Sequence, residues 1–423
     1  MLRSRSAPAT VMLAAIAVLL APAAEATNGY FTHGYGTSNK GLAGAGVAFP
    51  QDALTVATNP AGLAFLGKRY DAGLAVFNPN RHYTVSGNPS TFPGTFGLVP
   101  GTVESGSRVF FIPHFAASWE INSSSSWGFA LYGHGGMNTD YPTNTFFGTS
   151  PTGVDFSQLF VVPTYAFKLG GGNHALGITA ILAYQRFEIR GVQAFGMFSS
   201  NPGALSNNGH DSATGIGFKV GYLSKFSPRF SFGASYQFKI RMSEFDDYAG
   251  LFAEQGDFDV HPTWTAGIAI HATDRVTFVF DVQETMYSDT NSVGNPMLPN
   301  LFTAPLGADN GPGFGWQDMT TYKAGVQIAG ANGWTWRFGA STGDQPIPET
   351  EVLFNILAPG VMEEHFTVGF TKELRSGRKV NFALMHAPSV TVSGPNPLEV
   401  PGFQTIDLEM DQWEVELGYS WGF

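Results

Sequence analysis

The chain of 423 residues contains no cysteine, so no disulfide can hold its fold together. Backbone hydrogen bonds and packing must supply the stability instead. Charged residues are also scarce, at 13% of the chain, and acids outnumber bases, which leaves a formal net charge of −11. An acidic chain is a poor partner for nucleic acid, because binding to phosphates depends on Lys and Arg.

Long hydrophobic runs and chemical motifs are missing as well. After residue 26 no stretch of about 18 apolar residues occurs, so the chain offers no transmembrane helix. It has no phosphate-binding loop, and its ten histidines lack the spacing of a metal site, so we expect no cofactor and no metal. Ser341 lies in a G-x-S-x-G pattern, but Pro346 and Pro348 oppose the helix that a nucleophile elbow requires. A lipase is therefore the weakest alternative.

The N-terminus has the three parts of a secretory signal peptide. Arg3 and Arg5 form a basic start, and an unbroken apolar run extends from Val11 to Leu20. The small residues Ala24 and Ala26 then suit a signal peptidase. We predict that residues 1–26 are removed on export and that the mature chain begins at Thr27.

The C-terminus shows the clearest alternation in the chain. Its odd positions are apolar: Trp413, Val415, Leu417, Tyr419, Trp421 and Phe423. Glu414 and Glu416 stand between them, so a strand here would place both carboxylates on one face. Acids on an inner face indicate a wet interior. A terminal aromatic residue within such a strand resembles the insertion signal of bacterial outer-membrane proteins.

Similar alternation recurs along a chain that holds 37 Phe and 52 Gly. Fourteen segments follow the pattern, near 69–85, 107–121, 127–134, 156–169, 174–190, 213–226, 229–242, 262–271, 275–285, 319–329, 333–340, 364–373, 378–386 and 411–423. The segment 174–190 is apolar on both faces, which leaves its facing ambiguous. Short connections alternate strictly with long ones, as periplasmic turns and extracellular loops do. These features predict an all-β fold, a 14-stranded antiparallel transmembrane β-barrel spanning residues 69–423.

Residues 27–68 do not alternate, yet their content of small apolar residues is unlike that of a disordered tail. A barrel of this width needs more than side chains to fill it, so we expect these residues inside the lumen. The stretch containing Ser38, Gly41–Gly46, Gln51–Ala53 and the Asn59-Pro60-Ala61 triplet resembles the N-terminal hatch of the FadL family. Members of that family carry long-chain fatty acids across the outer membrane of Gram-negative bacteria, and relatives take up aromatic hydrocarbons.

The resemblance implies a barrel plugged by a hatch at residues 27–68, acting as a monomer among outer-membrane lipids. It implies that extracellular loops capture the substrate, which then reaches an apolar pocket beside Tyr30 and Phe31. It also implies lateral exit into the membrane at a kink in the third strand. Gly133, Gly135 and Gly136 are the candidates for that kink, because glycines permit bulges. A flexible start to an extracellular loop is the alternative for these glycines.

Two further groups of residues are candidates for substrate binding. Inward cations could bind a carboxylate, and the cluster to consider first is Lys239, Arg241, Lys323 and Arg337. Each could instead pair with a neighbouring acid or hold the hatch in place. An apolar capture surface is expected in the loop 191–212, from Phe195, Met197, Phe198 and Leu205.

These observations favour passive uptake of hydrophobic small molecules, such as long-chain fatty acids or hydrocarbons, without catalysis. A general polar porin is one alternative, although an open porin does not need a hatch. A barrel that displays its loops as an adhesin is the other.

Overall fold

The structure, a computed structural model, describes residues 27–422, so the predicted signal peptide at 1–26 and the terminal Phe423 lie outside the described residues. Fourteen antiparallel strands close into a barrel. They are β3 (Arg69–Ser86), β5 (Phe110–Asn122), β6 (Ser125–Asp140), β7 (Gly153–Leu169), β8 (His174–Arg190), β9 (Asp211–Ser227), β10 (Phe230–Gln237), β12 (Thr263–His271), β13 (Val276–Thr285), β14 (Met319–Ala329), β15 (Trp334–Gly343), β16 (Glu364–Glu373), β17 (Lys379–Pro395) and β18 (Thr405–Gly422). Pairing of β18 with β3 closes the wall.

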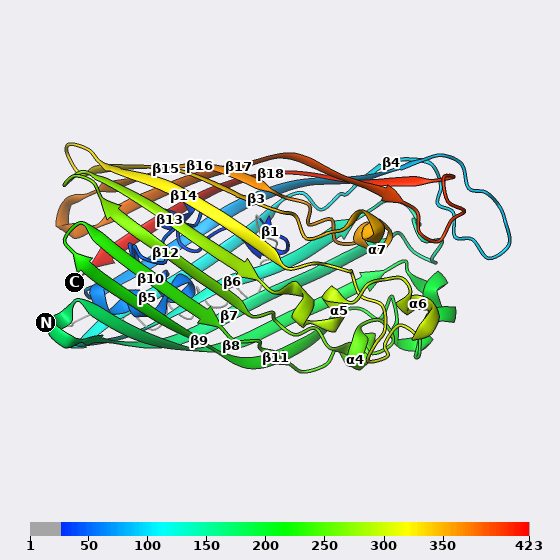
Figure 1. The fold of residues 1–423 in the computed structure, drawn as a ribbon, viewed down its shortest axis with the longest axis horizontal. Coiled ribbons are helices and arrows are strands. Elements are labelled where there is room, and N and C mark those ends of the chain that lie inside the picture. Colours follow the sequence, from blue (N-terminus) through cyan, green and yellow to red (C-terminus); the bar gives the residue numbers. More distant parts are fainter. Residues whose placement is uncertain (1–26, 423) are drawn as a thin grey trace, which may run out of the picture.

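The fourteen predicted segments correspond to these strands one by one. Tight turns gather at one end of the barrel, here the turn end, and long connections gather at the other, the loop end (Figure 1). The loop end carries the short strand β4 (Gly101–Glu104) and the short helices α4 (Ala253–Gly256), α5 (Asn291–Gly294), α6 (Asn300–Thr303) and α7 (Val352–Asn355). Several strands run further toward the loop end than predicted, because backbone pairing continues where the apolar alternation stops.

The two faces of the wall differ as the alternation predicts. On β13, Phe278 and Phe280 are 39% and 46% exposed on the outside, whereas Asp281 points inward and is buried. The strand β8, whose facing was ambiguous, turns its odd positions inward, among them Phe187 and Ile189. Most of its inward side chains are apolar, although Thr179 and Gln185 are also buried there.

The facing predicted for the end of β10 is wrong. Arg241 was expected to face the lumen, but its side chain is exposed, while Ile240 and Met242 are buried. Gln237 pairs with Lys219 of β9, whereas Arg241, in the short strand β11 (Arg241–Met242), pairs with Ile216. Four steps along one strand thus oppose three along the other. One extra residue reverses every side chain beyond it.

Residues 27–68 run inside the barrel and form short elements there (the blue ribbon in Figure 1). These are β1 (Thr27–Asn28), β2 (Phe31–Thr32), α2 (Thr37–Lys40), α3 (Thr55–Thr58) and the 3-10 helix η1 (Pro60–Phe65). Most of their side chains are buried against the inner wall. Within residues 27–422, no helix has both the length and the apolar character to cross a bilayer.

The outward position of Phe280 yields a test of the barrel's facing. Replacing Phe280, near the middle of β13, by Lys should lower the free energy of unfolding in lipid vesicles by about 2–4 kcal/mol, because a charge is costly at mid-bilayer depth. Urea-induced unfolding followed by tryptophan fluorescence measures it, with Phe280→Leu as the matched control. Equal stability of the two variants would contradict the assigned facing.

Candidate functional site

Glycines of the barrel wall allow the N-terminal segment, residues 27–68, to lie directly against it. They face each other in pairs on neighbouring strands: Gly177 with Gly221, Gly233 with Gly267, and Gly325 with Gly339. A Cβ atom on Gly221 would lie 2.1 Å from Oδ1 of Asn59, and one on Gly177 would lie 2.3 Å from the carbonyl carbon of Pro60. Any side chain at these positions would displace the segment. Part of the high glycine content of the chain therefore reflects this close approach.

The Asn59-Pro60-Ala61 triplet lies on the Gly177–Gly221 pair. The amide Nδ2 of Asn59 donates to the carbonyl oxygens of Val47, at 2.7 Å, and of Tyr222 on β9, at 2.9 Å. Its Oδ1 accepts from the backbone N–H of Ala61 at 3.1 Å, which caps η1. Pro60 occupies the first position of that helix, where its missing N–H costs nothing. One buried side chain thus joins the segment to itself and to the wall.

A buried ion pair attaches α2 to β18. The ammonium Nζ of Lys40 lies 2.9 Å from carboxylate oxygens of both Glu414 and Glu416. The hydroxyl of Thr37 donates to Glu416 at 2.6 Å. Both carboxylates are buried, at 2% and 0% exposure, so the prediction that they face a wet interior is wrong. The N-terminal segment occupies the space that water was expected to fill.

The four cations considered for carboxylate binding are not brought together. Nζ of Lys323 donates to the carbonyl of His33 at 2.9 Å, and Nε of Arg337 donates to Oε1 of Gln51 at 2.9 Å. These two side chains hold the N-terminal segment. Lys239 lies at the loop end, 3.1 Å from a carboxylate oxygen of Asp259. Because Arg241 points outward, the four do not form one anion site.

Tyr30 and Phe31 lie in an aromatic cluster toward the loop end. The hydroxyl of Tyr30 is 2.6 Å from Nε2 of His261, and the Phe31 ring stacks on Tyr287 with centroids 5.8 Å apart. Burial lowers the pKa of His261 to about 3, so its imidazole is neutral at physiological pH. The Tyr30 ring also lies 5.7 Å from that of Trp316. These neutral, mainly aromatic surroundings suit an apolar molecule.

The glycines at 133, 135 and 136 lie at an irregularity in the wall. Pairing of β6 with β7 shifts register between Gly133 and Gly135. In the described part of the chain, the pairing of β6 with β5 ends at Tyr132. Beyond that point the N-terminal segment takes over, because Phe31 pairs with Gly135 and the N–H of Gly136 donates to the carbonyl of Tyr30 at 3.0 Å. The wall between β5 and β6 is therefore completed here by residues that do not belong to it.

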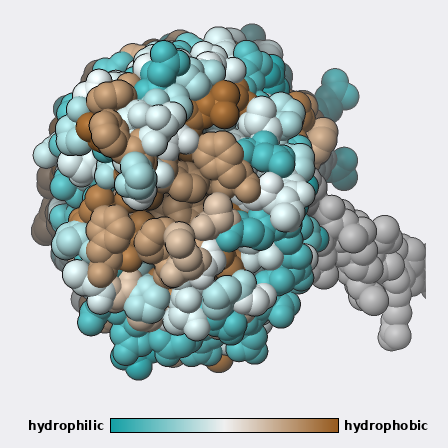
Figure 2. All heavy atoms as spheres, turned by 90° about the vertical axis from the view of Figure 1, so that its right-hand side faces the viewer, coloured by the Kyte–Doolittle hydropathy of each residue, from teal (hydrophilic) through white to brown (hydrophobic). Residues whose placement is uncertain are grey.

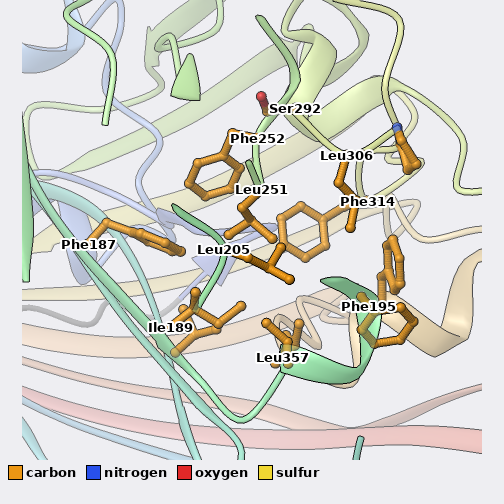
Figure 3. Close-up of a pocket in the computed structure, with 15 residues that line it drawn as sticks. Phe187, Ile189, Phe195, Leu205, Leu251, Phe252, Ser292, Leu306, Phe314 and Leu357 are labelled. Carbon is orange, nitrogen blue, oxygen red and sulfur yellow. The ribbon is translucent and has the colours of Figure 1, made fainter. Parts of the chain in front are cut away.

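An apolar cavity lies among the loops (Figure 3). Its walls come from β7, β8 and several loops far apart in the sequence, and include Phe187, Ile189, Phe195, Leu205, Leu251, Phe252, Leu306, Phe314, Phe354 and Leu357. Ser292 is the one polar side chain among the fifteen residues that line it, and its hydroxyl donates to the carbonyl of Asp257. With no ionisable side chain in its lining, the cavity offers contacts to apolar surface only.

The four residues expected to form a capture surface divide into two groups. Phe195 and Leu205 are buried, at 2% and 1% exposure, and line the cavity, so their prediction as exposed capture residues is wrong. Met197 is 83% exposed, and Phe198 packs against Phe302, which is 66% exposed. Hydrophobic side chains gather in a hollow at the loop end (Figure 2). Sequence reasoning missed the lining from the other loops, because apolar loop residues carry no periodicity.

Ser341 does not lie on the kind of turn that a nucleophile elbow requires. Ser341 lies within β15 rather than on a strand-to-helix turn, and its hydroxyl is 3.2 Å from Nδ1 of His365 on β16. Both side chains are buried. Across residues 27–422, no group of three or more His, Asp or Glu side chains is placed to hold a metal ion.

Fold and interior together define an outer-membrane β-barrel whose lumen holds its own N-terminal segment. Residues 17–396 match the family model described as outer membrane protein transport protein (OMPP1/FadL/TodX), and the chain belongs to this family. No curated protein sequence matches the chain.

Solved structures with the same fold include a FadL homologue of Pseudomonas aeruginosa, with 17% identity and a TM-score of 0.69, which covers 93% of this chain and 100% of that one. The toluene transporter TodX of P. putida has 16% identity and a TM-score of 0.68, covering 92% and 99%. The toluene transporter TbuX of Ralstonia pickettii has 16% identity and a TM-score of 0.63, with the same coverage.

Proposed function

We propose that the protein mediates passive uptake of hydrophobic small molecules across the outer membrane. The observation that carries this proposal is the apolar cavity at the loop end, whose lining has no ionisable side chain. Such a lining binds by removing apolar surface from water, at roughly 25 cal/mol for each Å². Because this driving force needs no energy source, capture can proceed down a concentration gradient.

The route we propose has three stages. Exposed apolar residues of the loops, Met197 and Phe302 among them, make first contact, and the molecule then enters the cavity. It next reaches the aromatic cluster around Tyr30 and Phe31. Because the N-terminal segment fills the lumen as a hatch, the exit we propose is lateral, between β5 and β6 at Gly133, Gly135 and Gly136. Moving Phe31 away from Gly135 would open that gap.

The filled lumen disfavours a general polar porin, because the buried N-terminal segment leaves little room for a water channel. Purified barrel in a planar bilayer should accordingly show little steady ion conductance. Large conductance would favour the porin, and cell adherence that depends on the loops, with uptake intact, would favour an adhesin. The family model that matches the chain describes a transport protein, which supports transport as the function.

Placing a charge in the cavity should abolish most uptake. We expect Leu205→Glu to lower the initial rate of toluene uptake into cells by about tenfold or more, because an apolar ligand cannot solvate a carboxylate. Toluene is a suitable first probe, since solved relatives are toluene transporters. Uptake of radiolabelled toluene measures the effect.

The matched control is Val99→Glu, which puts the same charge on a loop residue that is 71% exposed and outside the cavity lining. It should retain the rate of the unmodified protein. Uptake by Leu205→Glu at the control's rate would contradict the proposed role of the cavity.

A further inference from the structure

The turn that joins β16 to β17 is basic, although the protein as a whole is acidic. Residues 372–379, here the basic turn, hold four bases and one acid, whereas the chain has a formal net charge of −11. The turn lies at the turn end of the barrel (Figure 1). Arg375 and Arg378 are exposed, and Leu374 beside them is 41% exposed. The basic turn therefore presents cations together with an apolar side chain.

The cations of the basic turn are not neutralised by acids of the protein. In the part of the chain that the structure describes, none of its four bases forms an ion pair. Its one acid, Glu373, lies opposite Lys379 in the register of the two strands. Because cations so close together repel one another, an anion from outside the chain is favoured between them.

Aromatic side chains continue from the basic turn along the outer face of the wall. Nζ of Lys372 lies 5.0 Å from the ring centroid of Trp334, which stacks on Trp336 with centroids 5.6 Å apart. The Phe370 ring lies 5.4 Å from that of Trp334 and 5.1 Å from that of Phe382. A girdle of outward aromatic rings is typical of the level at which lipid headgroups meet acyl chains.

We propose that the basic turn and these aromatic rings bind an anionic phospholipid, phosphatidylglycerol, of the periplasmic leaflet. Short turns of an outer-membrane barrel face the periplasm, so the basic turn lies at the surface of that leaflet. The lipid phosphate accepts hydrogen bonds from Arg375 and Arg378, and the acyl chains pack on Trp336 and Phe382. An acidic soluble protein fits this surface less well, because it would not contact rings that face lipid. The proposal is independent of the uptake function.

The test compares two phospholipids that have the same acyl chains and differ in headgroup charge. The purified full chain in detergent receives equal amounts of dioleoylphosphatidylglycerol and dioleoylphosphatidylcholine, and native mass spectrometry measures which lipid it retains. We expect the unmodified protein to retain phosphatidylglycerol over phosphatidylcholine by about tenfold or more, because each Lys or Arg near an anionic headgroup strengthens binding by about fivefold. Replacing both Arg375 and Arg378 by Gln should lower the ratio to about threefold or less.

The matched control carries Arg229→Gln and Arg275→Gln, which remove two exposed arginines from other turns at the same end of the barrel. Its net charge equals that of the first double variant, but it should retain the ratio of the unmodified protein. An equal fall in both double variants would overturn the basic turn as the binding site and indicate general attraction to the turn end.

Equal retention of the two lipids by the unmodified protein would overturn the assignment of a phospholipid and favour an acidic protein partner instead. This comparison needs no substitution, so it decides the question even where a variant does not fold. Neither result would affect the proposed uptake of hydrophobic molecules.

Discussion

Replacing Lys40 by Met should lower the free energy of unfolding by about 3–5 kcal/mol, the largest loss that we expect from a single substitution. The ammonium of Lys40 lies between Glu414 and Glu416, 2.9 Å from an oxygen of each, and both carboxylates are buried. Without the cation, two negative charges would face each other in a space closed to water. Urea-induced unfolding in lipid vesicles measures the loss.

Two matched variants separate the charge from the shape of the side chain. Lys40→Arg keeps the charge and should recover most of the stability. Adding Glu414→Gln and Glu416→Gln to Lys40→Met removes the unpaired charges, so the triple variant should also be more stable than Lys40→Met alone. If Lys40→Met unfolded at the same urea concentration as the unmodified protein, the ion pair would not anchor α2 to β18.

Replacing Gly221 by Val should displace the N-terminal segment from the wall. The new Cβ would lie 2.1 Å from Oδ1 of Asn59 and 2.8 Å from Cδ of Pro60, and its own strand neighbours leave it no room to retreat. Overpacking of this kind costs about 1–3 kcal/mol, occasionally more. Because the segment fills the lumen, its displacement should raise ion conductance in planar bilayers, from near background to discrete steps.

The matched control is Gly67→Val, because a Cβ on Gly67 has no atom within 4 Å and its backbone is not in the left-handed region. It should conduct like the unmodified protein. Limited proteolysis gives a second readout, since a displaced segment exposes the backbone around Asn59 to cleavage. Unchanged conductance and unchanged digestion of Gly221→Val would show that this glycine is not needed for close packing.

The sequence predicted the strands of the barrel better than the contacts of the residues inside it. The number of strands and the direction of most side chains followed from the period of two. The reason is that residues facing lipid must be apolar, whereas the alternate residues that face the interior can be polar.

Predictions of side-chain direction from alternation fail at β-bulges. One extra residue between Gln237 and Arg241 turns Arg241 outward, although it was predicted to face the lumen. The register shift between Gly133 and Gly135 lies where β6 stops pairing with β5 and pairs with the N-terminal segment instead. Alternation is a local signal, and an inserted residue reverses it without any change in composition. Both irregularities became visible only from the pairing of the strands in the structure.

By itself, the sequence determined that this protein is a barrel with fourteen strands, a distinct N-terminal segment and an outer surface that suits lipid. These properties depend on neighbours along the chain and on the solvent each face meets. The tertiary structure alone decided that Lys40 meets Glu414 and Glu416, and that five aromatic side chains from β8 and separate loops enclose one apolar cavity. Contacts between residues hundreds of positions apart depend on how the barrel closes. A local sequence pattern does not predict them.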